Sequence, residues 1–202
     1  VYQFDGSGNP WVRKGAGVIS GEQENDMHGF SVSLSSNGNT VAIGAPYNDV
    51  IKHNPYESTN NAGKVRVYRY DAEVDWNHEY LQSWKQVGGN IGGEAQTDYS
   101  GWSVSLSGDE NIVAIGAVGN DGDATGSNAG NVRVYEFDGT DWVRMGNDID
   151  GETAGDNSGY TVSLSKNGRA VAIGAIKNDG NGLESGHVRV YDLAFHPYLP
   201  PP

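Results

Sequence analysis

The apolar residues of this chain come in short runs that alternate with polar residues and are separated by turns rich in glycine and asparagine. The pattern is clearest over residues 103–117, where Ser-Val-Ser-Leu-Ser precedes a polar turn and the run Ile-Val-Ala-Ile-Gly-Ala. Two alternating runs joined by such a turn predict a β-hairpin. The same pattern recurs at residues 31–45 and 161–175. The sequence therefore predicts a repeat built on β-hairpins.

Two independent markers give the repeat its period. The Ile-Gly-Ala element recurs at intervals of 72 and 58 residues, and a Gly-Glu pair recurs at the same two intervals. Each unit contains four short alternating runs, which is the strand content of one propeller blade. We therefore expect an all-β fold of four-stranded antiparallel, β-propeller-type blades. The expected units are a half repeat at 1–28, repeats at 29–98, 99–156 and 157–193, and a proline-rich tail or linker at 194–202.

The strand count raises a question of closure. The half repeat supplies two strands, two full repeats supply eight and the last supplies three, which makes 13 strands. A closed propeller needs at least four blades of four strands. We expect either a part of a longer propeller or open edges that other chains satisfy, the latter as a head-to-tail filament.

The charge of the chain limits the classes of partner that it can bind. The chain has 202 residues, with 26 acidic against 13 basic side chains and a net charge of −13. Such a surface repels phosphate backbones and anionic membranes, so we expect no nucleic-acid binding and no membrane insertion. Cations or proteins with basic patches are its natural partners, although acidic side chains also serve solubility alone. The absence of cysteine excludes disulfides and thiolate metal sites.

Three segments carry a family resemblance. The sequences Gly-Phe-Ser-Val at 29–32, Ile-Gly-Ala-Pro at 43–46 and Gly-Lys-Val-Arg-Val-Tyr at 63–68 resemble the FG-GAP repeat of integrin-α-type β-propellers. The resemblance extends over nearly the whole chain and implies extracellular or cell-surface adhesion and recognition. Many such repeats carry a calcium loop of the Asp-x-Asp-x-Asp-Gly type between the first two strands. Here that loop is a short turn with few acids, so the family's calcium site is not carried over.

A separate acidic cluster is a candidate calcium site, because calcium takes six to eight oxygen ligands, often from alternating acids around a glycine turn. The other repeats keep only its glutamate and its last aspartate, as Glu22 with Asp26 and Glu94 with Asp98. The recurring aspartate is therefore more consistent with a cap on the turn into the next hairpin. The candidate cluster consists of Asp148, Asp150, Glu152 and Asp156.

Each repeat also has an arginine between two valines in the same expected strand. By the two-residue period of a strand, this arginine points to the face opposite its valine neighbours. A guanidinium buried between blades needs charge-assisted hydrogen bonds, and a recurring glutamate series is available. We expect a structural ladder that pairs Arg66, Arg133 and Arg189 with Glu22, Glu94 and Glu152.

Aromatic residues occupy matched positions in the repeats. Sugars stack on aromatic rings, but recurrence at matched strand positions favours packing between blades. The two series are Phe30, Trp102 and Tyr160, and Trp11, Trp84 and Trp142.

No catalytic motif accompanies these features. The sequence has no Gly-x-Ser-x-Gly elbow, phosphate loop or dinucleotide fingerprint, and the five histidines share no spacing typical of metal ligands. We expect a non-enzymatic module for adhesion, recognition or structural assembly. A filament subunit and a calcium-dependent lectin or adhesin are the alternatives. The expected partner is a protein or a second copy, with a glycan as a further candidate, and the proline-rich tail is a candidate for O-glycosylation.

Overall fold

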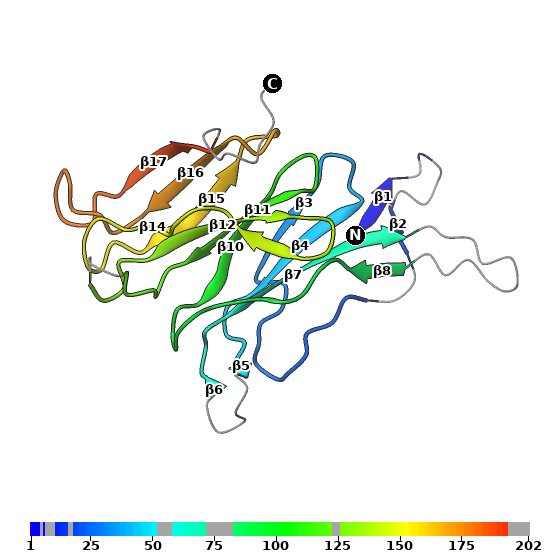
Figure 1. Cartoon of the computed structure of the whole chain (residues 1–202), viewed down its shortest axis with the longest axis horizontal. Helices are drawn as coiled ribbons and strands as arrows, with labels where there is room; N and C mark the ends of the chain where they lie inside the picture. The colour runs from blue at the N-terminus through cyan, green and yellow to red at the C-terminus, as the bar shows by residue number, and fades with distance from the viewer. Residues whose placement is uncertain are drawn as a thin grey trace, which may run out of the picture.

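The computed structural model describes residues 1–4, 6, 11–15, 18–51, 58–71, 83–122 and 126–193. All regular structure in these residues is β-strand, arranged as antiparallel sheets that lie side by side (Figure 1). The expected proline-rich tail, 194–202, lies outside the described residues.

The first complete blade, called blade 1, has four antiparallel strands in the order β3-β4-β7-β8. A fifth, two-residue strand pairs with the end of β7, and a two-stranded ribbon occupies the loop before β7. The bounds are β3 (Ser31–Leu34), β4 (Thr40–Ala45), β5 (Val50–Ile51), β6 (Ser58–Thr59), β7 (Lys64–Asp71), β8 (Ser83–Gln86) and β9 (Ile91–Gly92).

Blade 2 repeats this arrangement, and blade 3 has its first three strands. Blade 2 consists of β10 (Ser100–Leu106), β11 (Ile112–Ala117), β12 (Asn131–Phe137), β13 (Trp142–Arg144) and the short β14 (Ile149–Asp150), which pairs with β12. Blade 3 consists of β15 (Ser158–Leu164), β16 (Ala170–Ala175) and β17 (His187–Asp192). At the other end a half-blade is formed by β1 (Tyr2–Phe4) and β2 (Trp11–Arg13).

The all-β, propeller-type blades expected from the sequence are therefore confirmed. The half-blade and the three blades contain two, four, four and three of the expected strands. Sequence reasoning did not find β5, β6, β9 and β14, because two-residue strands are too short to show an alternating pattern.

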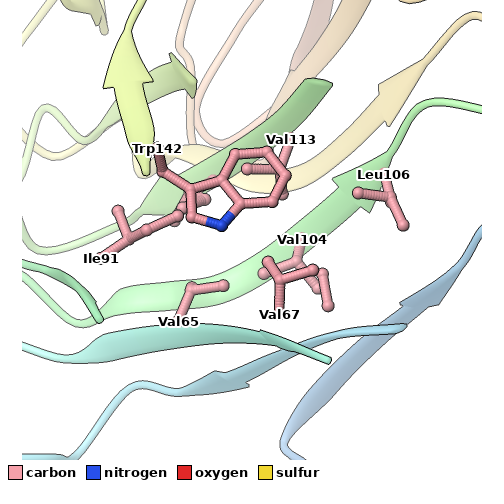
Figure 2. Close-up of a cluster of buried hydrophobic side chains, with 9 residues drawn as sticks. Val65, Val67, Ile91, Val104, Leu106, Val113 and Trp142 are labelled. Atoms are coloured by element: carbon pink, nitrogen blue, oxygen red, sulfur yellow. The ribbon is translucent and has the colours of Figure 1, made fainter. Parts of the chain in front are cut away.

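The core lies between blades. In blade 1, the valines on either side of Arg66 are fully buried, and they meet apolar side chains from three strands of blade 2 (Figure 2). The blade 2 residues of this cluster include Val104, Leu106, Val113, Ile115 and Trp142. A second cluster repeats the same contact between blades 2 and 3. Each blade thus has a front face, toward the following blade, and a rear face, toward the preceding one.

Serine hydroxyls join the innermost strands of successive blades. The Ser31 Oγ donates to the Gly101 carbonyl at 2.7 Å, and the Leu106 N–H donates to the Ser33 Oγ at 2.9 Å. The same two bonds join blade 2 to blade 3 through Ser103 and Ser105, at the same distances. The alternating serines of the repeat therefore serve the contact between blades, while the residues between them fill the core.

Candidate functional site

The arginine and glutamate series meet at the boundaries between units. The Arg66 guanidinium lies 3.2 Å from the Glu22 carboxylate, and the Arg133 guanidinium lies 2.5 Å from that of Glu94. In the third pair, Arg189 and Glu152, the separation is 3.8 Å. Each glutamate belongs to the segment that closes one unit, and each arginine belongs to the third strand of the next. The ladder therefore connects consecutive units.

The middle arginine has the densest set of partners. Its Nε and Nη2 donate to the Asp148 carboxylate at 3.0 and 2.8 Å, in addition to the contact with Glu94. Burial by itself lowers the pKa of the Arg133 guanidinium, but the hydrogen bonds and charge of Asp148 outweigh it, and the pKa is raised. Arg133 is thus a fixed charge at the boundary, and Asp148 is engaged with it.

The four acidic residues of the calcium candidate are not brought together. Asp148 binds Arg133 and Arg144, and Glu152 lies beside Arg189 and His187. Asp156 accepts hydrogen bonds from Thr153 and Asn178, and the Asp150 carbonyl accepts one from Arg189. The described part of the chain contains no group of three or more acidic or histidine side chains that could hold a metal ion. In the sequence, Asp156 recurs in the other repeats as Asp26 and Asp98, whereas the four-residue cluster does not recur. This difference distinguished the structural Asp156 from Asp148 and Asp150.

The recurring aspartate caps a tight turn. Asp26, Asp98 and Asp156 are all buried, and each accepts a hydrogen bond from a backbone N–H three residues before it. The residue after each aspartate has a positive φ, of 52°, 55° and 53°. Three buried carboxylates in one role support the turn-capping interpretation.

The first aromatic series forms a continuous row across the inner ends of the blades. The rings of Phe30 and Trp102 are 4.8 Å apart, and those of Trp102 and Tyr160 are 5.8 Å apart. Tyr47 and Tyr99 flank the row through edge contacts. These rings pack between blades, as the matched positions indicate, while Phe30 and Tyr160 remain 45% and 37% exposed. This aromatic row is the first candidate recognition surface.

The tryptophan series closes the outer edges of the blades. The Trp142 Nε1 donates to the Val87 carbonyl of blade 1, and the Trp84 Nε1 donates to the Lys14 carbonyl of the half-blade, both at 2.9 Å. Packing between units is confirmed for these two. Trp11 differs: it is exposed and contacts Phe4 of its own hairpin, because the described residues place no unit behind the half-blade.

An apolar groove of about 450 Å³ lies between the half-blade and the rear face of blade 1. Its walls include Val1 from the half-blade side and, from blade 1, Val32, Leu34, Ile43 and Trp84. Val32 and Leu34 are 63% and 50% exposed, whereas Val104 and Leu106 at the matched positions are 8% and 6% exposed. The groove is thus a blade boundary that is incompletely filled.

His28 lies in the wall of this groove and is the one titratable group there with a large shift. Burial, assisted by the charge of Arg66, lowers the pKa of His28 to about 4. The Arg66 Nη2 lies 3.4 Å from both ring nitrogens. The matched positions in the next repeats are Ser100 and Ser158, so a histidine stands at this position only at the boundary that forms the groove.

The front face of blade 3 is the second open surface. Val188 and Val190 on β17 are 69% and 70% exposed, while Val132 and Val134 at the matched positions of β12 are 0% and 2% exposed. Sequence reasoning singled out neither this face nor the groove. The sequence contained a signal for both surfaces. The apolar residues that blade 2 buries against its neighbours recur in blades 1 and 3, on faces that no described blade covers.

Comparison with known proteins agrees with this architecture. Residues 93–135 and 149–191 match the FG-GAP repeat. Each match begins in the segment that closes one unit and ends with the Arg-bearing strand of the next, at Tyr135 and Tyr191. No curated protein matches the sequence.

Among solved structures, a periplasmic gluconolactonase of Pseudomonas aeruginosa superposes with a TM-score of 0.51 at 15% identity, over 96% of this chain and 45% of that one. This chain therefore spans less than half of that protein, and the likeness shows the fold alone. The tricorn protease (TM-score 0.40, 10% identity, 73% and 11% of the two chains) and the hydrazine synthase of Kuenenia stuttgartiensis (0.39, 14%, 88% and 50%) are more distant. In the residues described, no helix could cross a membrane.

Proposed function

We propose that this chain, with its two FG-GAP repeats, is a non-enzymatic assembly and recognition module that joins other FG-GAP blades through the front face of blade 3. The observation that carries the proposal is the exposed pair Val188 and Val190, whose counterparts in blades 1 and 2 are buried against the next blade. Contiguous exposed apolar side chains on a soluble protein mark interaction surfaces.

Polar groups support the same surface. The Thr161 and Ser163 hydroxyls of β15 match Ser31 and Ser33, which bond the inner strand of the following blade. Gly174 matches Gly44 and Gly116, where the backbone of the following blade approaches closely. Around Gly174, a Cβ would meet only Thr161. Blade 3 thus presents the inner-strand hydroxyls, the glycine and the third-strand valines that the other blades use for contact.

The partner implied by these groups is the rear face of another blade, offering aliphatic side chains and a free inner-strand backbone. The recurring charged residues pair across the blade boundaries rather than converge in a pocket, which supports a structural over a catalytic role. FG-GAP repeats are typical of extracellular or periplasmic proteins, which supports a role for the module outside the cytoplasm.

Self-association tests the proposal. Sedimentation velocity over a wide concentration range should show reversible oligomers of the wild-type chain. Val190→Asp should abolish them, because a carboxylate would be buried without a partner. Val143→Asp, at a half-exposed valine on β13 outside this face, is the matched control and should associate like the wild type. A monodisperse wild-type monomer at every concentration, or equal association of all three proteins, would overturn the proposal.

The aromatic row supports a second candidate, recognition of a glycan by ring stacking. The exposed rings of Phe30 and Tyr160 at the two ends of the row are the favourable observation. An oligosaccharide array probed with the wild type and with Tyr160→Ser tests it, since stacking on an aromatic face is lost in the variant. An array without binding, or binding unaffected by the substitution, would remove this candidate.

A further inference from the structure

We infer that the groove between the half-blade and blade 1 is an acceptor site for a β-hairpin with the pattern of the inner two-stranded hairpin of these repeats. The inference rests on the proposed assembly function and names a second surface for it. Three features of the groove support it: an open strand edge, an exposed apolar wall and hydrogen-bonding groups that the equivalent boundaries satisfy.

The open edge belongs to β1. In blades 1, 2 and 3 the third strand pairs on one side with the second strand of the blade, as β7 with β4, β12 with β11 and β17 with β16. The matching strand β1 pairs only with β2 in the described residues. Its other edge borders the groove, which Val1 and Tyr2 help to line. Such an edge accepts an added strand through main-chain hydrogen bonds.

The apolar wall is the rear face of blade 1. At the boundary between blades 1 and 2, this position is covered by Ala42 of a second strand and by two valines of a third strand. In the half-blade, Val1 supplies one of those valines, and the described residues supply no alanine equivalent. An incoming second strand would place its alanine over Val32 and Leu34. The side chain has to be small, because Ala42 and Ala114 are both completely buried.

Two backbone groups at the inner edge of the groove lack, among the described residues, the hydroxyl partners that the matched groups have at the other two boundaries. Leu106 and Leu164 donate their N–H groups to a serine of the preceding blade, and Gly101 and Gly159 accept from another. In blade 1 the matched groups are the Leu34 N–H and the Gly29 carbonyl. No serine or threonine among the described residues bonds them. An incoming first strand of the Ser-x-Ser type would supply both hydroxyls.

The probe is a synthetic peptide with the sequence of residues 160–176, which contains the Thr-Val-Ser and Val-Ala-Ile runs, a net charge of +2 and no tryptophan. By analogy with the boundaries between blades 1 and 2 and blades 2 and 3, the peptide's Ser163 should accept a hydrogen bond from the Leu34 N–H, and its Ala172 should pack on the apolar wall. Titration calorimetry with the wild-type chain should give one site per chain, with a dissociation constant on the order of 1–100 μM for such strand addition.

Matched variants locate the site. Val32→Asp in the protein should weaken peptide binding at least about tenfold, whereas Val143→Asp should leave it unchanged. Both valines are at least half exposed, so both variants should fold, which circular dichroism checks. In the peptide, Ser163→Ala should weaken binding by about tenfold through one lost hydrogen bond. Bound peptide should also slow hydrogen exchange at the Leu34 amide.

Two results would overturn the inference: no binding of the native peptide, or equal binding of a scrambled peptide of the same composition. Peptide binding is measured at a protein concentration too low for self-association, so that the blade 3 face of the protein does not take part in it. Val190→Asp should bind the peptide like the wild type, so loss of self-association and loss of peptide binding can be told apart.

Discussion

Arg133 and Glu94 lie 39 residues apart in the chain, yet their charged groups are 2.5 Å apart across the boundary between two blades. The guanidinium is 5% exposed and also binds Asp148, whereas the corresponding Arg189 is more exposed and lies 3.8 Å from Glu152. The three rungs of the ladder therefore share a geometry but differ in burial, and burial decides their contribution to stability.

The first prediction compares two rungs. Arg133→Ala should lower the free energy of unfolding by about 3 kcal/mol, because it removes the more deeply buried of the two arginines that bind the partly buried Asp148. Arg189→Ala should lower it by less than about 1 kcal/mol, since its partner Glu152 is 52% exposed and lies 3.8 Å away. Urea unfolding of both variants measures the difference. Equal losses would show that the burial of the middle rung does not matter.

Much of this architecture could be predicted from the sequence, because a residue that recurs at the same position of every repeat indicates that packing determines that position. The serine that follows Val104, which recurs in the other two hairpins, and the arginine between two valines are examples. The repeat also separated the turn-capping Asp156 from the Asp148 and Asp150 beside it, which lack counterparts at the matched positions of the other repeats.

The groove and the blade 3 face could not be found in this way. A residue such as Val32 has the same sequence environment as the buried Val104, and only the arrangement of whole blades decides which one a neighbour covers. The partners of Asp148 were equally hidden, because Arg133 and Arg144 approach it from two strands whose pairing sets the distance.

The second prediction concerns two matched glycines. A Cβ on Gly116 would lie 2.1 Å from the Gly159 carbonyl oxygen of blade 3, a backbone atom held by the Ser103 hydroxyl. A Cβ on Gly174 would meet only Thr161, and the one close contact is with its side-chain hydroxyl, which can rotate. Gly116→Ala should therefore cost at least about 3 kcal/mol of stability and Gly174→Ala less than about 1 kcal/mol.

Thermal and urea unfolding of the two glycine variants provide the measurement, with circular dichroism to check that each retains β-structure. A Gly116→Ala protein as stable as the wild type would mean that blades 2 and 3 do not approach as closely as described.

The third prediction concerns the turn cap Asp156. Burial tends to raise the pKa of its carboxyl, but hydrogen bonds from Thr153 and Asn178 lower it further than burial raises it, and the net pKa lies below the usual 3.8. The folded state thus prefers the carboxylate. The stabilisation is present above the unfolded pKa and is lost as the pH falls through the lower folded value.

Asp156→Ala should lower the unfolding free energy by about 1–3 kcal/mol at pH 7, because the donors that it satisfied are left unpaired. The loss should shrink at pH 2, because more of the wild-type carboxyl is protonated there than at pH 7. Urea unfolding at the two pH values gives the comparison, and a loss that is the same at both would contradict the role assigned to the charge.

The last prediction follows from His28 in the groove wall. Burial and the nearby Arg66 guanidinium lower its pKa from 6.5 to about 4, while the charges of Glu22 and Asp26 act weakly in the opposite direction. Between these two pH values the unfolded chain takes up a proton that the folded chain does not. The contribution of His28 to stability is therefore complete above about pH 6.5 and declines as the pH falls toward 4.

Serine occupies the matched position in the next two repeats, so His28→Ser is a substitution that the fold already accommodates at Ser100 and Ser158. The variant should lose less stability than the wild type between pH 7 and pH 4.5, when both are unfolded with urea at the two pH values. Acidic groups such as Glu22 titrate in both proteins, so their effect largely cancels in the comparison. Parallel pH profiles for the two proteins would mean that His28 is solvated in the folded chain and that the groove wall is looser than its contacts indicate.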